Sequence, residues 1–286
     1  MVKSIFFILK DKITYFLYRI FVFFKYFNKK NNINAYWFHY KKNFGDFITP
    51  LLLQKYGYNP IFAQPNDAQL ISTGSLFEHI PANFKGVIIG TGFIDEKSLL
   101  YPSKAKILSV RGKLSLNKIN SHYKDNILLG DPGLLADKLL KVRQIKKYKL
   151  GIVPHWIDKD SMIFNRLSNN LNKDILLIDV EDDPINVIEQ IDRCENIISS
   201  SLHGLIVADS LGIPTGWVLS DKVLGGKFKF YDYYSSLDVE CEPINIFGNE
   251  DLDVLMNMTT LKPQNVISDL KKNIDKCFRD LVEILK

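Results

Sequence analysis

Cysteine is scarce in this sequence of 286 residues, with Cys194, Cys241 and Cys277 as the only three. Their odd number and wide spacing exclude a disulfide framework and match no zinc-site spacing. The histidine and acidic residues show no metal-ligand spacing either, so we expect no metal and no bound cofactor. Unpaired cysteines fit a reducing compartment, and we predict a cytoplasmic protein.

The sequence also lacks an apolar run long enough to cross a bilayer. Residues 1–32 are rich in aromatic side chains, but charges at residues 10–12, Arg19 and Lys25 interrupt them before about 20 apolar residues accumulate. A signal peptide would need a small-residue cleavage site, which this segment lacks. We therefore expect an amphipathic helix over residues 1–32 that lies on the membrane surface. The alternative is a helix that packs on the protein's own domain or on a second subunit.

A basic face is missing from the rest of the chain. The formal net charge is +5, and residues 1–30 contain seven basic residues and one acidic residue, so the remainder is close to neutral. This distribution excludes a nucleic-acid-binding surface on the folded domain and leaves residues 1–30 to contact anionic headgroups. Hydrophobic residues make up 46% and charged residues 24%, which excludes a disordered chain.

No repeat of solenoid period is present, and strand-like and helix-like segments alternate instead. A first series predicts strands at residues 33–39, 69–71, 86–89, 106–110 and 126–129, with helices at 47–56 and up to about 140. A basic, weakly structured link over residues 141–149 leads to a second series. That series predicts strands at 150–153, 174–180, 197–201 and 215–219, with helices at 159–171, 184–194 and 265–285. The pattern predicts an α/β fold of two Rossmann-like, doubly wound domains, residues 33–145 and 146–286, that face one another across a cleft.

One stretch combines a buried strand, a tight turn and a helix start. Residues 197–204 read Ile-Ile-Ser-Ser-Ser-Leu-His-Gly, and an apolar helix pattern follows as far as Gly212. At such a turn the backbone N–H groups of the helix start can hold an anion, and His203 lies there too. A lone histidine is more often structural, so this position needs support from the other motifs.

Further candidates follow other predicted strands. Arg111 could hold a carboxylate or phosphate through two parallel hydrogen bonds, or form a structural salt bridge. Asp46 could act in catalysis or simply cap the helix that follows it. His155 alone is more often structural, and Lys229 lies after a glycine pair in either a binding loop or a solvated loop.

In order, these motifs resemble those of the polysaccharide pyruvyl transferases, whose fold is similar to the two-domain glycosyltransferase architecture called GT-B. The resemblance rests on Asn43-Phe-Gly-Asp46, Gly90-Thr-Gly92, Val110-Arg-Gly112, Gly130-Asp-Pro-Gly133, Val153-Pro-His155, Ser200-Ser-Leu-His-Gly204 and Lys229-Phe-Tyr-Asp-Tyr233. Two positions depart from the family: many members have an acidic residue at Gly112, and some have an arginine at Ser201.

The resemblance implies transfer of pyruvate from phosphoenolpyruvate onto two hydroxyls of a sugar, which forms a cyclic ketal and releases phosphate. Arg111 and Lys229 would hold the donor's anions, His203 would donate the first proton or stabilise the departing phosphate, and Asp46 would be the base for the acceptor hydroxyl. The first domain would lie on the acceptor side and the second on the donor side. The substrate-binding residues that the resemblance implies are Asn43, Gly45, Gly92, His155, Ser200, Ser201, Leu202, Gly204 and Lys229.

The implied partners are phosphoenolpyruvate and a glycan acceptor, carried on a polyprenyl-diphosphate lipid at the inner face of the cell membrane. Two other functions stay open. One is a GT-B glycosyltransferase that uses a nucleotide sugar, for which residues 181–183 are the candidate ribose-binding carboxylates. The other is a non-catalytic scaffold of polysaccharide assembly.

Overall fold

The computed structural model describes residues 31–98, 102, 104–119, 124–169, 172–219 and 225–285. The predicted amphipathic helix lies outside these ranges except for its last two residues. Within them, every helix is too short or too polar to cross a membrane.

The first sheet is parallel throughout and has the strand order β2-β1-β3-β4-β5-β6. Its strands are β1 Asn32–Tyr36, β2 Asn59–Phe62, β3 Leu70–Ile71, β4 Val87–Ile89, β5 Lys106–Val110 and β6 Leu128–Leu129. The helical segments between them are α2 Ile48–Lys55, η1 Phe77–His79, α3 Lys113–Lys118, η2 Lys124–Asn126 and η3 Pro132–Leu139. The sequence analysis did not predict β2 or α3. Pro60 lacks a backbone N–H, and β2 tolerates it because this strand lies at the edge of the sheet.

The second sheet is also parallel and has the order β10-β9-β7-β8. Its strands are β7 Tyr148–Val153, β8 Ile175–Leu177, β9 Cys194–Ser199 and β10 Thr215–Trp217. Its helices are α4 Met162–Asn169, α5 Pro184–Asp192, α6 Leu202–Ser210, α7 Phe228–Ser236 and α8 Leu252–Asn257. Strand β9 begins three residues before its predicted start at residue 197. The exposed Glu195 interrupts the apolar run from which the strand was predicted.

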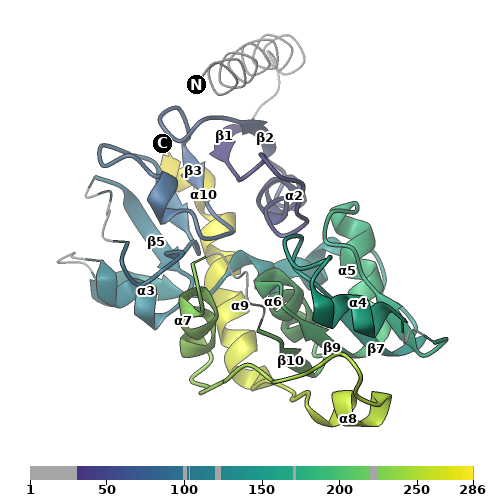
Figure 1. The fold of residues 1–286 in the computed structure, drawn as a ribbon. Coiled ribbons are helices and arrows are strands. Elements are labelled where there is room, and N and C mark those ends of the chain that lie inside the picture. The colour runs from purple at the N-terminus through teal and green to yellow at the C-terminus, as the bar shows by residue number, and fades with distance from the viewer. Residues whose placement is uncertain are drawn as a thin grey trace, which may run out of the picture.

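The chain returns to the first sheet at its end. Helices α9 Gln264–Arg279 and α10 Leu281–Leu285 follow the second sheet, and α9 packs against β5, β6 and η3, as the yellow helix in Figure 1 shows. The Tyr58 hydroxyl donates to the carbonyl of Phe278 at 2.9 Å. The alternating α/β fold with parallel sheets is therefore confirmed. Helix α9, which the prediction placed in the second domain, contacts the first sheet, and its residues Ile267 and Leu270 also pack with Leu205 and Trp217.

The basic link between the sheets is more ordered than predicted. Arg143 Nε lies 3.0 Å from both carboxylate oxygens of the buried Asp192. Lys146 Nζ donates to the carbonyl of Cys194 at 2.6 Å. The basic side chains of the link therefore fix it to the second sheet.

Helix α6 lies where the two sheets meet. All nine of its residues are buried, and it packs on η3 from the first sheet and on β9 and β10 of the second. The apolar residues of α6 are spread around its circumference, so it has no charged face for solvent and its sequence favours burial between layers. The start of α6, which carries His203, is thereby placed at the junction.

Candidate functional site

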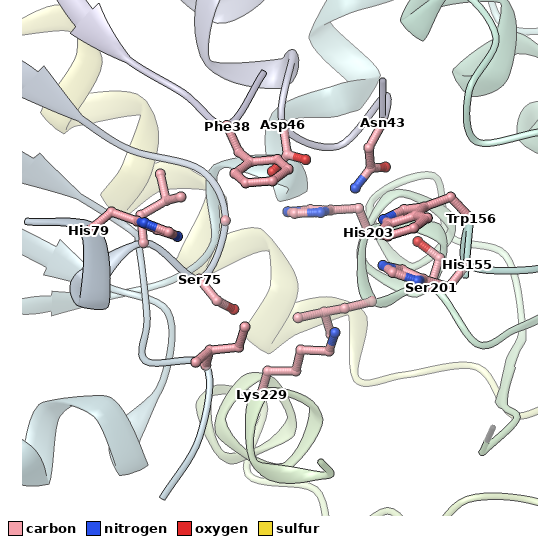
Figure 2. A pocket seen from close by; sticks show the side chains of 14 residues that line it. Phe38, Asn43, Asp46, Ser75, His79, His155, Trp156, Ser201, His203 and Lys229 are labelled. Atoms are coloured by element: carbon pink, nitrogen blue, oxygen red, sulfur yellow. The ribbon is translucent and has the colours of Figure 1, made fainter. Parts of the chain in front are cut away.

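A cavity of about 150 Å³ opens at this junction. Its walls come from the loops that follow β1, β3, β4, β7 and β9, together with the start of α7 (Figure 2). Ligands of parallel α/β sheets bind beyond the carboxyl ends of the strands, and here both sheets direct those ends to one cavity.

Seven of the residues predicted from the sequence line the cavity, namely Asn43, Asp46, His155, Ser201, Leu202, His203 and Lys229. Five do not line it, namely Gly45, Gly92, Arg111, Ser200 and Gly204. The position of each of these five explains its residue type, as described below.

His203 is the second residue of α6, and its side chain is buried against a carboxyl group from the first sheet. Its Nε2 lies 3.9 Å from Oδ1 of Asp131, an oxygen that accepts the N–H of Gly133 at 2.8 Å. Among the described residues, neither His203 Nε2 nor the second carboxyl oxygen of Asp131 has a hydrogen-bond partner. Burial and the charge of Arg111 lower the pKa of His203 to about 3, and burial raises the pKa of Asp131 to about 7. The imidazole is therefore neutral at neutral pH.

Gly45 lets the imidazole of His203 approach the backbone of the loop after β1. A Cβ at this position would lie 2.2 Å from His203 Nδ1. We expect Gly45→Ala to displace the ring and to lower turnover about 100-fold, the cost of a misplacement of about 1 Å. Steady-state kinetics of the purified variant would measure the loss.

Gly57→Ala is the matched control, because nothing lies within 4 Å of a Cβ at Gly57. This control carries the backbone strain of a positive φ but should keep full turnover. Normal turnover in Gly45→Ala would show that the imidazole position does not limit the reaction.

Asp46 lines the cavity and does not cap α2. The N-cap position of α2 belongs to Phe47, which makes no side-chain cap bond. The Asp46 carboxyl is hydrogen-bonded to Asn43, and burial raises its pKa to about 7 although Asn43 and Lys229 both lower it. The capping interpretation is therefore wrong, and the carboxyl group carries a proton in part of the molecules at neutral pH.

Lys229 brings a buried cation to the opposite wall of the cavity. Its side chain lies in the first turn of α7 and is 9% exposed. Within the described residues, no carboxylate lies at ion-pair distance from its ammonium. Burial and the nearby Arg111 lower its pKa to about 8, while Asp158 and Asp46 act in the opposite direction. A lysine in this state favours an incoming anion.

Ser200 positions the loop that carries His155. The Ser200 hydroxyl donates to Asp158 at 2.7 Å and accepts the backbone N–H of His155 at 2.9 Å. His155 Nδ1 accepts the N–H of Ile157 at 3.4 Å, which leaves the imidazole proton on Nε2. Burial and Lys229 lower the pKa of His155 to about 3, so this ring is also neutral.

Arg111 lies behind the cavity wall and is fully buried. Its Nε donates to Asp232 at 2.9 Å, Nη1 to the Ser75 hydroxyl at 2.7 Å and Nη2 to the carbonyl of Phe93 at 2.6 Å. A Cβ at Gly92 would lie 2.5 Å from the guanidinium carbon. The prediction that Arg111 contacts the donor directly disagrees with this placement, since only Ser75 of these residues faces the cavity.

Two further glycines permit close contacts between segments. A Cβ at Gly112 would lie 1.6 Å from the carbonyl oxygen of Asp232, so the approach of α7 excludes any side chain there. A Cβ at Gly204 would lie 2.5 Å from Ser199 Oγ, at the join between β9 and α6. Gly112 and Gly204 therefore shape the site without lining it.

Several residues of the site were not predicted. Asp131 lies in a motif that the sequence analysis quoted, and its position directly after β6 was an available signal. Phe38, Ser75 and Trp156 lie in loops and His79 ends η1, all outside the quoted motifs, so only the structure brings them together. In the described part of the chain, no group of three or more His, Cys, Asp or Glu residues is arranged to hold a metal ion.

Comparison with known proteins gives two curated relatives and a solved structure. The "Succinoglycan biosynthesis protein ExoV" of Rhizobium meliloti (strain 1021) is 26% identical over 219 residues, which cover 73% of this chain and 66% of that protein. The "Uncharacterized protein L143" of Acanthamoeba polyphaga mimivirus is 36% identical over 166 residues, 56% of this chain and 57% of that protein. The chain thus spans less than two thirds of each relative. A functionally uncharacterized protein of Klebsiella pneumoniae has a TM-score of 0.46 at 15% identity, covering 83% of this chain and 98% of that one.

A family model matches most of the chain. The model described as polysaccharide pyruvyl transferase matches residues 7–222, which include every residue that lines the cavity except Lys229. The resemblance found in the sequence motifs is thereby confirmed, and the chain belongs to the polysaccharide pyruvyl transferase family.

Proposed function

We propose that this protein transfers pyruvate from phosphoenolpyruvate onto two hydroxyls of one sugar, in a surface polysaccharide or its polyprenyl-diphosphate-linked precursor. The products are a cyclic ketal and phosphate. Family membership supports the transfer of pyruvate. The observation that carries the mechanism is the pair formed by Asp46 and His203, whose pKa values are displaced in opposite directions inside one cavity.

The donor's anions bind between Lys229 and the start of α6. Lys229 offers a buried positive charge, and the side chain of Ser201, the N-cap residue of α6, makes no cap bond to the first backbone N–H groups of the helix. A helix start with free N–H groups attracts phosphate and carboxylate groups. Ser201 stands where some family members have an arginine, and Lys229 supplies the missing cation. Arg111 adds its charge from behind Ser75.

Opposite pKa shifts assign the acid and the base. A group with a raised pKa keeps its proton at neutral pH and can donate it, whereas a group with a lowered pKa stays free to accept one. Asp46 is therefore the proton donor and His203 the proton acceptor. This assignment reverses the roles expected from the sequence, where burial of the two groups could not be known.

The proton transfers close into a cycle. Asp46 protonates the methylene carbon of the donor, and the first sugar hydroxyl adds to the central carbon as its proton passes to His203. The bond between that carbon and the phosphate oxygen then breaks, and the phosphate leaves with the proton held by His203. The second hydroxyl attacks the same carbon and returns its proton to Asp46. Both residues recover their starting states.

The pH dependence of kcat/KM tests this assignment, because it reports the pKa values of the free enzyme. We expect kcat/KM to fall as pH rises through about 7, where Asp46 loses its proton. A second fall is expected through about 8, where Lys229 loses its charge. Initial rates at subsaturating donor, measured from about two pH units below the first pKa to about one unit above the second, would resolve both steps.

Two variants identify the groups whose titration causes the two falls in kcat/KM. Asp46→Asn should slow the reaction and remove the step near 7, since the amide cannot titrate. Lys229→Arg should keep donor binding and remove the step near 8, because arginine stays protonated. A rate that rises with pH through 7 would instead make Asp46 the base.

The direct test of the function is phosphate release from phosphoenolpyruvate by the purified full chain, with a panel of lipid-linked and synthetic glycosides. Release that depends on the acceptor, with a product heavier by pyruvate less water, is the expected result. Stabilisation of the fold by phosphoenolpyruvate in a thermal shift assay provides an acceptor-independent reading. Stabilisation by a nucleotide sugar instead would contradict the proposal.

The glycosyltransferase alternative finds little support in the carboxylates that were its candidates. Glu181 forms ion pairs with Lys41 at 2.6 Å and Lys159 at 2.5 Å. Asp183 caps α5 by accepting the N–H of Ile185 at 2.9 Å. Both are engaged away from the cavity. The scaffold alternative predicts that the cavity residues can be replaced without consequence, and the variants above test it.

We further propose that the enzyme works at the inner face of the cell membrane, where it meets a lipid-linked acceptor. The seven basic and many aromatic residues in the first thirty positions support this location.

A further inference from the structure

Three aromatic side chains form a continuous strip from the cavity to the open surface. Phe38 and His79 line the cavity, and their ring centroids lie 6.2 Å apart. Tyr40 extends the row outward, with its centroid 5.6 Å from that of Phe38 and 56% of its surface exposed. We call Phe38, His79 and Tyr40 the aromatic strip.

Trp156 faces the strip from the other side of the cavity. Figure 2 shows Phe38 and Trp156 on either side, with Asp46 and Asn43 between them. Lys41 Nζ lies 5.5 Å from the centre of the Trp156 ring. Two aromatic walls thus flank the carboxyl group that acts as the acid.

The cavity lining separates into two kinds of surface. His203, Lys229 and the start of α6 belong to chain segments that follow β9 and β10, and they supply the partners for an anionic donor. The aromatic strip comes from the loop after β1 and from η1, which follows β3. The faces of aromatic rings bind a phosphate or a carboxylate poorly. The strip therefore binds the other substrate, the sugar acceptor.

A pyranose ring fits such a surface. Its C–H face is apolar and flat enough to cover an aromatic ring, while its hydroxyls project from the edge toward hydrogen-bonding groups. The strip offers ring surface directly beside Asp46 and Asn43, which supply the polar partners at the edge.

We propose that the aromatic strip is the acceptor subsite and binds a pyranose ring by stacking, which presents two hydroxyls to Asp46 and His203. This inference rests on the proposed function and names the substrate class of its second site. The loop that carries Phe38 and Tyr40 is held in place before binding: Phe44 donates its N–H to the carbonyl of Val180 at 2.8 Å. A preformed platform lowers the ordering cost of binding.

Acceptor binding without donor tests the proposal independently of any chemistry. Saturation-transfer NMR would be recorded on the full chain with a panel of hexopyranosides and no phosphoenolpyruvate. We expect Phe38→Leu to weaken binding about three- to tenfold, the loss that a missing aromatic contact produces. Phe38→Trp should restore it. Phe247→Leu is the matched control, because Phe247 is 70% exposed and does not line the cavity.

Tryptophan fluorescence gives a second reading. Trp37 and Trp217 are buried, so quenching of the emission by acrylamide reports on Trp156. We expect a bound sugar to protect this emission from the quencher. In turnover, Phe38→Leu should raise KM for the acceptor and leave KM for phosphoenolpyruvate unchanged.

Equal sugar affinity in wild type and Phe38→Leu would overturn the proposal, as would the absence of binding across the hexopyranoside panel. Failure of the proposed function has a different signature. In that case phosphoenolpyruvate would neither bind nor be consumed, while sugar binding to the strip could still be measured.

Discussion

Replacing His203 with alanine should lower turnover by about 10² to 10⁴, the usual contribution of one positioned proton-transfer group. The variant loses the acceptor of the first hydroxyl proton, and no other side chain of the cavity repeats its geometry beside Asp131. Donor binding should remain, because Lys229 and the backbone N–H groups of α6 are unchanged.

The fold should tolerate this loss. The imidazole is neutral, and its Nε2 has no hydrogen-bond partner in the described part of the chain. The melting temperature should therefore stay within about 4 °C of wild type. His203→Gln is a matched variant that retains a polar group but cannot transfer a proton at this pH, and it should be as slow as the alanine variant. Substantial activity in His203→Gln would mean that the residue acts by hydrogen bonding alone.

Replacing Arg111 with methionine should destabilise the protein by about 3 to 5 kcal/mol, the cost of removing one partner of a buried ion pair. Asp232 would keep its hydrogen bonds from the N–H of Ser115 at 2.7 Å and from the Ser115 hydroxyl at 2.6 Å. It would lose the only guanidinium among its described contacts, and its side chain is fully buried. Urea unfolding would measure the change.

Two control variants distinguish the cost of breaking a buried ion pair from the cost of breaking an exposed one. The double variant Arg111→Met with Asp232→Leu should regain most of the stability, since no unpaired charge is left. Lys272→Met breaks an ion pair in which both side chains are 72% exposed, and its cost should stay below about 1 kcal/mol. If Arg111→Met unfolds like wild type but no longer binds phosphoenolpyruvate, the guanidinium contacts the donor, as the family resemblance implied.

The sequence alone determined the alternation of strands and helices and the turn that carries His203. Both depend on local patterns: β5 has the predicted bounds, and the apolar run before residues 200–204 forms strand β9, which ends at Ser199 and is separated from α6 by two residues. The order of short motifs was sufficient to indicate the family, because most of the motifs mark a loop at a strand end, although the one at residues 229–233 lies in α7.

Tertiary structure decided how the site works. Asp232 lies 121 positions from Arg111, and their pairing holds the guanidinium, which was predicted to bind the donor, behind Ser75. Asp131 meets His203 across the junction of the two sheets. The pKa shifts on which the proposed acid and base roles depend arise from burial and from charges on distant segments, and no local pattern encodes these. The packing of α9 against the first sheet was not predictable for a similar reason. The amphipathic pattern of a helix predicts that one face is buried, but it does not predict against which surface.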